Sequence, residues 1–459
     1  MRNARKALCG LLALLILALA GCACDQGGVT GGTKAPEDGG QAAEGNVQLL
    51  TWANAPTVNF LRALAESFHQ SYPSYTLQVT DAPQSEHDQV MQTRLSAGNV
   101  DIVSFQQFSK PQEDWNAAAM DKPLWQQYID EGLLLDLSQE AFMARFTESA
   151  KQDNAYNGKN YSMPTSTVAY NGLFYNKTIF EELNLSVPTT WDAFIDLCQA
   201  IRDDGRYAVI TCGAADQWPL NMFATGIMTS LYGEESEAIG QGIFTGEIKH
   251  TDPQILELYA MMDQFASFLE PGVTGVAYSD VPGRFASGKV AMLADGSWQA
   301  PTIDAANPDF AYGYFPIPGK TVREDGLPPQ FGIKYDLAFA VAANAKNKEG
   351  ALAFLDYFST KEVYTDFLNA VGGFTPTQPD ITLDNAFLNS LSSGLQKPYV
   401  HAEHRLYSPK GVGEYGGNGG FSFFYLKTLG GPFTYEELAQ RAEEDFETAR
   451  KAAASLTGR

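Results

Sequence analysis

The sequence predicts an α/β protein that contains more than one structural unit. Its 459 residues are too many for one compact core, because single cores stop growing at roughly 250–300 residues. Hydrophobic residues make up 44% of the chain and charged residues only 19%, which supplies large cores and excludes wholesale disorder. Strand-like and helix-like patterns alternate along most of the chain, and this alternation is typical of sheets covered by helices.

The N-terminus has the order of charges and apolar residues that is typical of an export signal. Three basic residues precede an apolar run over 7–20, which ends in Leu-Ala-Gly-Cys over 19–22. This ending resembles the bacterial lipoprotein signal, in which cleavage leaves the cysteine as a lipid-bearing N-terminus. We therefore expect a signal peptide over 1–21 and lipidation at Cys22. The alternative is an ordinary cleaved signal.

The segment that follows, 22–46, predicts a flexible tether, because it contains paired glycines, little apolar material and no periodicity. Removal of the signal takes three of the 31 basic residues and none of the 54 acidic ones, so the mature chain carries a formal charge of −26. Such a surface repels nucleic acid and anionic lipid. We expect no nucleic-acid partner, and a globular body held above a membrane by its anchor.

Cysteine and histidine residues give little chemistry. Cys198 and Cys212 could form one bridge, or remain as two buried free thiols. His401 and His404 lie one helical turn apart, but no third ligand cluster accompanies them, so a surface loop is expected. We predict no metal and no cofactor.

The globular body begins with the pattern of a doubly wound parallel sheet. The expected elements are a strand over 47–52, a helix whose apolar face includes residues 60–68, a strand over 76–80, a helix over about 86–97 and a buried strand over 100–105. In such sheets, ligands gather at the carboxyl ends of the strands. The residues that follow the first and third strands are therefore site candidates: Trp52, Asn54, Phe105, Gln106 and Gln107. For Trp52 and Phe105, core packing is the alternative.

The stretch GRFASGKVAMLADGSW, 283–298, matches the opening of a phosphate-binding loop. A phosphate loop needs a strand before the glycines and a helix after them. Here a helical or turn segment comes first, a strand follows Gly288, and Val290 stands where the hydroxyl that binds magnesium belongs. The pattern therefore does not indicate a nucleotide site.

The same stretch resembles a signature of the extracellular solute-binding proteins of ABC uptake systems, in the family that includes maltose-binding protein. Its marks are an F-x-SGKVAM strand and a closing GSW. Further stretches match the family in the same order, at 156–164, 173–201, 312–319, 337–360 and 433–452. The resemblance covers about 47–452.

The resemblance implies the two-lobed periplasmic-binding-protein-like fold of type II, in which each lobe is a sheet flanked by helices. Crossover segments near 165–170 and 310–318, with a third passage near 360, would form the hinge. The expected lobes are residues 47–168 plus 317–360, and residues 169–316 plus 361–459. Ligand would bind between them.

The implied function is capture of an extracellular sugar or oligosaccharide and its delivery to the transmembrane permease subunits of an ABC importer. The protein would be a monomer, lipid-anchored outside the cytoplasm, and not an enzyme. Two alternatives come from other classes. One is the ligand-sensing subunit of a signalling receptor, and the other is a secreted carbohydrate-active enzyme with two carboxylates across a cleft.

A sugar site needs aromatic faces for the C–H patches of a pyranose and a few aimed polar groups for its hydroxyls. Trp298 corresponds to the family's stacking tryptophan in the GSW turn. Trp218 aligns with another cleft-edge region, and Asp216 and Asn221 beside it are possible hydroxyl partners. Core burial is the alternative for both tryptophans.

Two further regions carry candidates by the same resemblance. Tyr170 and Asn171 lie at the first crossover, where family members direct polar or aromatic groups at the ligand. Phe423 lies among three phenylalanines at 421–424, where a relative carries another stacking aromatic. No tryptophan stands there, so a core position is the alternative. The identity of the sugar does not transfer.

Overall fold

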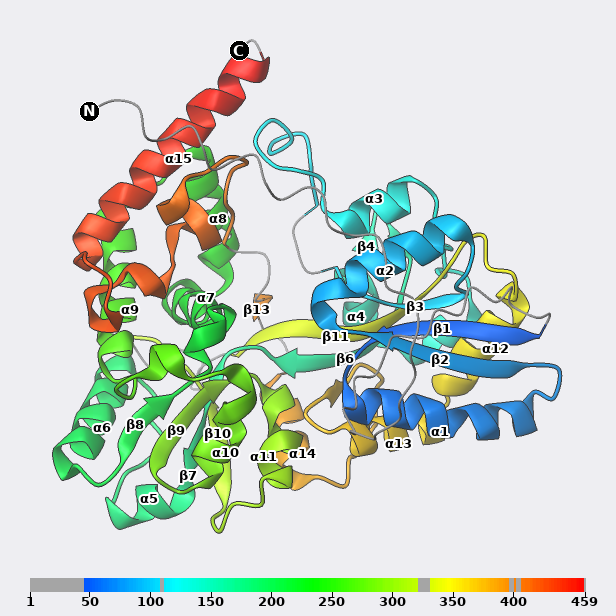
Figure 1. Cartoon of the computed structure of the whole chain (residues 1–459), viewed down its shortest axis with the longest axis horizontal. Helices are drawn as coiled ribbons and strands as arrows, with labels where there is room; N and C mark the ends of the chain where they lie inside the picture. Colours follow the sequence, from blue (N-terminus) through cyan, green and yellow to red (C-terminus); the bar gives the residue numbers. More distant parts are fainter. Residues whose placement is uncertain (1–44, 108–110, 321–330, 396–399, 402–405, 458–459) are drawn as a thin grey trace, which may run out of the picture. The chain divides into compact units, whose positions relative to one another are not determined.

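The computed structural model describes residues 45–107, 111–320, 331–395, 400–401 and 406–457 (Figure 1). The predicted signal peptide, Cys22 and nearly all of the tether lie outside the described residues. No helix among those residues has both the length and the apolarity needed to cross a bilayer.

In the described part of the chain, the first sheet has seven strands in the order β12-β6-β11-β3-β1-β2, with β13 paired to β11. β1 is parallel to both β2 and β3, which confirms the predicted doubly wound start, and β11 is antiparallel to β3 and β6. The strands are β1 (Asn46–Trp52), β2 (Thr76–Ala82), β3 (Ile102–Phe105), β6 (Met163–Ala169), β11 (Gly332–Val341), β12 (Thr375–Pro376) and β13 (Val400–His401).

Helices cover both faces of this sheet, with α1, α12 and α13 on one face and α2 and α3 on the other (Figure 1). The apolar side of α1 packs into the core, where Leu61 and Phe68 are fully buried. The helices are α1 (Ala55–Ser71), α2 (Gln84–Ala97), α3 (Leu124–Asp130), α4 (Glu148–Asp153), α12 (Lys348–Phe358) and α13 (Lys361–Val371). A short hairpin, β4 (Ala155–Tyr156) and β5 (Lys159–Asn160), precedes β6.

The second sheet has four strands among the described residues, in the order β10-β7-β9-β8. They are β7 (Gly172–Asn176), β8 (Ala208–Thr211), β9 (Val290–Asp295) and β10 (Tyr312–Pro316). The helices of this half are α5 (Lys177–Glu182), α6 (Trp191–Asp204), α7 (Trp218–Tyr232), α8 (Ser236–Thr245), α9 (Pro253–Ser267), α10 (Val281–Ala286), α11 (Ala300–Ala305) and α15 (Tyr435–Thr457). α10 precedes β9, which confirms the order that excluded a phosphate loop.

The chain passes between the two sheets after β6 and again after β10. β6 belongs to the first sheet and β7 to the second, and only Tyr170 and Asn171 separate them. The return runs from β10 to β11. In Figure 1, β6 and β11 lie side by side and extend from the first sheet toward the second. A side chain could not replace Gly172 at the first passage, because its Cβ would lie 2.5 Å from the Tyr314 ring.

The third passage was predicted too early, near 360, with 361–459 assigned to the second lobe. In the structure, α13 packs beside α1, and Phe367 and Leu368 lie in the core of the first sheet. β12 then pairs with β6. The chain therefore remains part of the first half through β12, at least to Pro376. Helix α14 (Ala386–Gly394) follows. An amphipathic helix shows which of its faces is buried but not which core buries it.

Cys198 and Cys212 are both free and buried in the core of the second half. The structure thus decides between the two alternatives in favour of free thiols. Burial raises the pKa of each thiol, so both remain protonated and unreactive at neutral pH.

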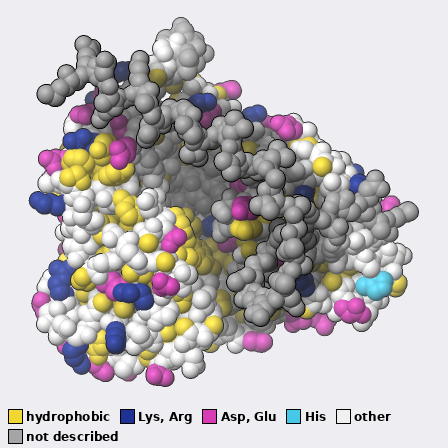
Figure 2. Space-filling view, viewed as in Figure 1, with side chains coloured by type: hydrophobic (Ala, Val, Ile, Leu, Met, Phe, Trp, Pro, Cys, Tyr) yellow, Lys and Arg dark blue, Asp and Glu magenta, His cyan; other side chains and the backbone are white. Residues whose placement is uncertain are grey.

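Charges of both signs share the surface of the second half. On the face drawn in Figure 2, acidic side chains lie scattered among Lys and Arg over these elements. The described residues of this face therefore show no continuous basic area of the kind that nucleic acids require.

Candidate functional site

Four aromatic side chains gather beside the passage between the two sheets, and we call them the aromatic cluster: Tyr170, Trp218, Tyr278 and Trp298. The ring centroids of Trp218 and Tyr278 are 4.7 Å apart, those of Trp218 and Trp298 are 6.5 Å apart, and those of Tyr170 and Trp298 are 5.8 Å apart. Trp298 is half-buried, and Trp218 keeps 41% of its surface exposed. The cluster thus presents aromatic surface to solvent on a fixed framework.

The backbone around Trp298 holds its ring close to the chain. Trp298 lies in the short 3-10 turn Ser297–Gln299 that follows β9, and its ring covers Gly296, where a Cβ would lie only 2.1 Å from the indole. Ser297 Oγ accepts a hydrogen bond from the Ala169 backbone N–H and donates one to the Gly373 carbonyl. Ser297 therefore ties this turn to β6 and to the segment after α13.

A relay of hydrogen bonds orients the indole. Trp298 Nε1 donates to Tyr278 Oη at 2.7 Å, and the Tyr278 hydroxyl donates to Asp295 Oδ1 at 3.4 Å. Asp295 is 1% exposed and also accepts from the Gly296 backbone N–H and the Gln299 side chain. Burial raises the pKa of Asp295 to about 7, because these hydrogen bonds only partly offset the loss of hydration.

Asp216 fixes the backbone at Tyr278, one of the four residues of the cluster. Its carboxylate accepts a hydrogen bond from the Tyr278 backbone N–H at 2.6 Å. Gln217, which follows it, has a positive φ of 64°, and this turn starts α7 at Trp218. The turn sets the position of the exposed indole at the first residue of a helix.

Two charged side chains of β11 adjoin the cluster. Lys334 Nζ lies 5.7 Å from the centroid of the Trp298 ring and 5.9 Å from that of Tyr170. The same ammonium lies 3.5 Å from Asp336 Oδ2, and both side chains are only 13% exposed. Gln106 Nε2 donates to Asp336 Oδ1, which connects this ion pair to the end of β3.

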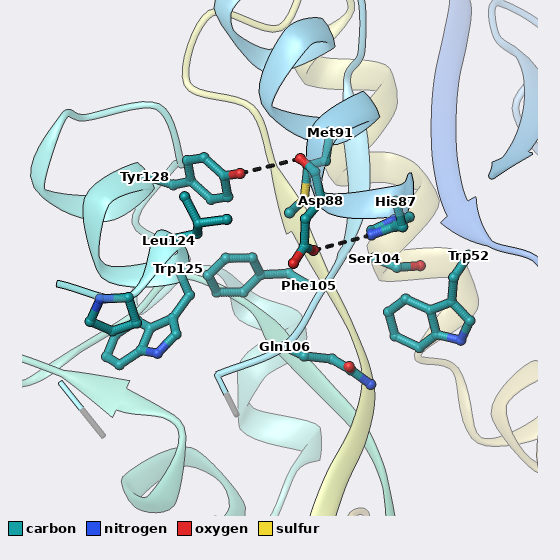
Figure 3. A pocket seen from close by; sticks show the side chains of 11 residues that line it. Trp52, His87, Asp88, Met91, Ser104, Phe105, Gln106, Leu124, Trp125 and Tyr128 are labelled. Atoms are coloured by element: carbon teal, nitrogen blue, oxygen red, sulfur yellow. Dashed lines mark hydrogen bonds and ion pairs between the residues drawn. The ribbon is translucent and has the colours of Figure 1, made fainter. Parts of the chain in front are cut away.

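A cavity of about 410 Å³ lies at the carboxyl ends of β1 and β3, where the sequence placed a site. Trp52, Phe105 and Gln106 form its side along the sheet, and residues of α2 and α3 close the rest (Figure 3). Gln106 belongs to this pocket and also contacts Asp336. A continuous series of contacts therefore leads from the pocket through Asp336 and Lys334 to the aromatic cluster.

The other predicted site residues lie in different surroundings. Asn54 caps α1 by accepting a hydrogen bond from the Thr57 backbone N–H at 3.1 Å. Asn171 is buried and accepts from the Gly332 backbone N–H, while its Nδ2 has no hydrogen-bond partner among the described residues. Gln107 Oε1 and Asn221 Oδ1 are likewise buried and unpartnered in the described part of the chain.

Phe423 is fully buried in the core of the second half, so it has no surface that could stack on a ligand. Its core alternative is the one that the structure realises. The structure thus brings together Trp298, Trp218, Tyr170 and Asp216 and leaves Phe423 apart from them.

Several residues of the site were missed from the sequence: His87, Tyr278, Asp295, Lys334 and Asp336. Lys334 and Asp336 carried a usable signal, because they interrupt an otherwise apolar strand pattern at GIKYDLAFAV. Asp295 ends a fully buried strand, which is also unusual for a carboxylate. Tyr278 lies in a loop that gives no periodic signal. Among the described residues, no group of three or more metal-ligating side chains is found.

Comparison with known proteins gives the family and the fold. Residues 54–365 match the profile of the family described as "Bacterial extracellular solute-binding protein". The multiple sugar-binding protein of Streptococcus mutans is 26% identical over 68% of this chain and 70% of its own length. The maltotriose-binding protein of Pyrococcus abyssi is 23% identical over 82% of this chain and 77% of its own.

Solved structures agree with this result. RafE in complex with raffinose superposes with a TM-score of 0.64 at 22% identity and covers 88% of this chain and 99% of that one. A chitin oligosaccharide binding protein gives a TM-score of 0.66 at 20% identity, with 88% of this chain and 99% of that one covered. At these identities the likeness concerns the fold, and the predicted two-lobed α/β architecture is confirmed.

Proposed function

We propose that this chain, which belongs to the bacterial extracellular solute-binding proteins, captures a sugar or oligosaccharide and delivers it to an ABC importer. The family match covers more than half of the chain and gives an extracytoplasmic location. The names of two relatives, multiple sugar-binding protein and maltotriose-binding protein, support a carbohydrate as the solute.

The aromatic cluster is the observation that carries this proposal. The exposed indole of Trp218 and the half-buried indole of Trp298 offer ring faces, onto which the C–H patches of a pyranose pack. Buried charges and amides beside these rings, at Lys334, Asp336 and Gln106, supply donors and acceptors for hydroxyl groups.

The carboxylates near the cluster support binding rather than hydrolysis. A glycosidase needs one carboxyl group free to donate a proton and another free to attack or to activate water. Asp295 is enclosed by its hydrogen bonds, Asp216 is bonded to the Tyr278 backbone N–H, and Asp336 is bonded to Gln106. Asp295 and Asp216 thus hold the cluster in position, and Asp336 contributes hydrogen bonding rather than a free catalytic carboxyl group.

Delivery follows from a population shift. A ligand that contacts groups from both halves stabilises the arrangement in which they approach, and the permease subunits would recognise that arrangement. We propose that the protein acts as a monomer, tethered through a lipid on Cys22. Loss of membrane retention in a Cys22→Ala variant, with unchanged sugar binding, would support the anchor. Full retention would refute it.

The function is tested by titration calorimetry and thermal melting with raffinose, maltotriose, D-glucose and D-galactose. Binding raises the melting temperature by mass action, and no product forms if the protein is not an enzyme. Sugar cleavage detected by chromatography would favour the hydrolase alternative. Uptake of the bound sugar that continues in cells without the protein would favour a sensor.

A further inference from the structure

His87, which lines the pocket at the ends of β1 and β3, carries a buried ring nitrogen that no described residue satisfies. His87, in α2, is 4% exposed, and its Nε2 has no hydrogen-bond partner in the described part of the chain. The other ring nitrogen, Nδ1, lies 3.7 Å from Asp88 Oδ1. The Trp52 ring meets the imidazole edge-on at a centroid distance of 5.5 Å (Figure 3).

A buried, unpaired ring nitrogen is unfavourable unless it has a partner at some stage of function. Burial removes its water, and the loss is recovered only when a donor or acceptor arrives. His87 borders the cavity, so a molecule bound there can supply that partner. An apolar residue of similar size at this position would avoid the cost altogether.

The lining of the pocket favours a neutral, polyhydroxyl ligand. Trp52 keeps part of its ring exposed beside the mostly buried Trp125, and none of the described lining residues is Lys or Arg, so an anion would lack a counter-charge. Asp88 is the pocket's acidic side chain, and 71% of that side chain faces solvent, where its attraction for a cation is screened. A volume of about 410 Å³ is near the small end of the range for ligand pockets, which suits one ring rather than a chain.

The pocket is also connected to the aromatic cluster. Gln106 lines the cavity and donates through Nε2 to Asp336, and Asp336 pairs with Lys334 beside the Trp298 ring. We infer that the pocket binds one neutral hexose ring at the end of an oligosaccharide whose remaining rings lie on the aromatic cluster, and that His87 Nε2 recognises a hydroxyl of that terminal ring. This inference rests on the proposed function.

The test compares His87→Phe with wild type, using raffinose and maltotriose as oligosaccharide probes. Phenylalanine keeps the ring and removes the nitrogen, so affinity for the bound trisaccharide falls about tenfold, the loss of one hydrogen bond. The unliganded variant unfolds at the same or a higher urea concentration, because the unsatisfied nitrogen is gone. A merely structural histidine would instead lose stability and keep its affinity.

Two variants sharpen the result. His87→Gln restores a polar group and recovers part of the affinity. His69→Phe is the matched control, because His69 lies in α1 and hydrogen-bonds the Tyr75 carbonyl away from the pocket, so its affinity stays at the wild-type value.

The outcomes separate this inference from the proposed function. Wild-type affinity in His87→Phe, together with weakened binding in Trp298→Ala, overturns the assignment of His87 and leaves sugar binding intact. Binding of spermidine in the pocket in place of any sugar overturns the choice of a neutral ring. If no sugar of the panel binds the wild-type protein, the sugar function and this inference both fall.

Discussion

The aromatic cluster and the pocket differ in how their polar groups are satisfied. In the cluster, Trp298 Nε1 donates to Tyr278, and Tyr278 donates to Asp295, so the rings are held by bonds inside the protein. In the pocket, His87 Nε2 is buried without a partner among the described residues. The polar groups of the cluster are thus bonded within the protein, whereas the pocket leaves a nitrogen that, by our inference, a ligand hydroxyl pairs with.

This difference indicates how each region would contribute to sugar affinity. A preorganised aromatic surface binds many sugars, because its side chains lose little conformational entropy on binding and contact mainly the C–H faces of the sugar rings. A pocket with an unpaired nitrogen discriminates, because a ligand without the matching hydroxyl leaves the nitrogen unsatisfied. We therefore expect changes in the cluster to alter affinity for all bound sugars, and changes at His87 to alter selectivity.

The largest effect is expected at Asp295, which supports the cluster from inside the core. Its folded pKa of about 7 lies above the ordinary value of 3.8 for an aspartate, so the native state binds the proton more tightly, and stability falls as pH rises from about 4 to 7. The maximum loss is on the order of 4 kcal/mol. Urea unfolding between pH 4.5 and 8 measures it.

Asp295→Asn removes this titration and flattens the pH profile of stability. Asp130→Asn is the control, because Asp130 forms an exposed ion pair with Lys122 and its loss leaves the slope unchanged. If Asp295→Asn keeps the wild-type slope, the buried carboxyl is not the titrating group.

Trp298→Ala comes next, with an expected loss of about 1–3 kcal/mol in sugar-binding free energy, because it removes the central ring of the cluster. Calorimetry with the sugar that binds most tightly measures it. Trp115→Ala is the matched control, since Trp115 packs against Phe244 and Tyr407 instead of the cluster. Equal losses in the two variants would contradict a specific role for Trp298.

Tyr278→Phe keeps the ring and removes the acceptor for Trp298 Nε1. We expect about 1 kcal/mol weaker binding, the usual value of one hydrogen bond, because the indole is less firmly oriented. A change in tryptophan fluorescence of the unliganded protein should accompany it. Unchanged affinity would show that packing alone orients Trp298.

Trp218→Ala has the smallest expected effect, about 0.5 kcal/mol in binding, the low end of the range for aromatic stacking, because its ring is partly exposed. The urea midpoint should hardly move. A loss larger than that of Trp298→Ala would reverse the order of the two rings and make Trp218 the main stacking surface.

Much of the fold followed from local patterns. The alternation of strands and helices from 47 to 105 gave the parallel β2-β1-β3 unit, since each element shows its own periodicity. Trp298 and Trp218 were predicted as stacking residues through the family resemblance, and the structure places their ring centroids 6.5 Å apart. His87 was missed because a histidine within an ordinary helical pattern gives no sign of facing a cavity.

The sequence alone predicted the α/β class from short-range periodicity. Its contiguous motifs, through their resemblance to a known family, predicted the family and the two-lobed fold. Tertiary structure decided that α13 packs with the first core, that Cys198 and Cys212 remain apart, and that Asp295 stands behind Trp298. It also decided that His87 Nε2 is buried without a hydrogen-bond partner among the described residues. These features depend on which distant segments meet, and a chain does not specify its long-range neighbours by any local pattern.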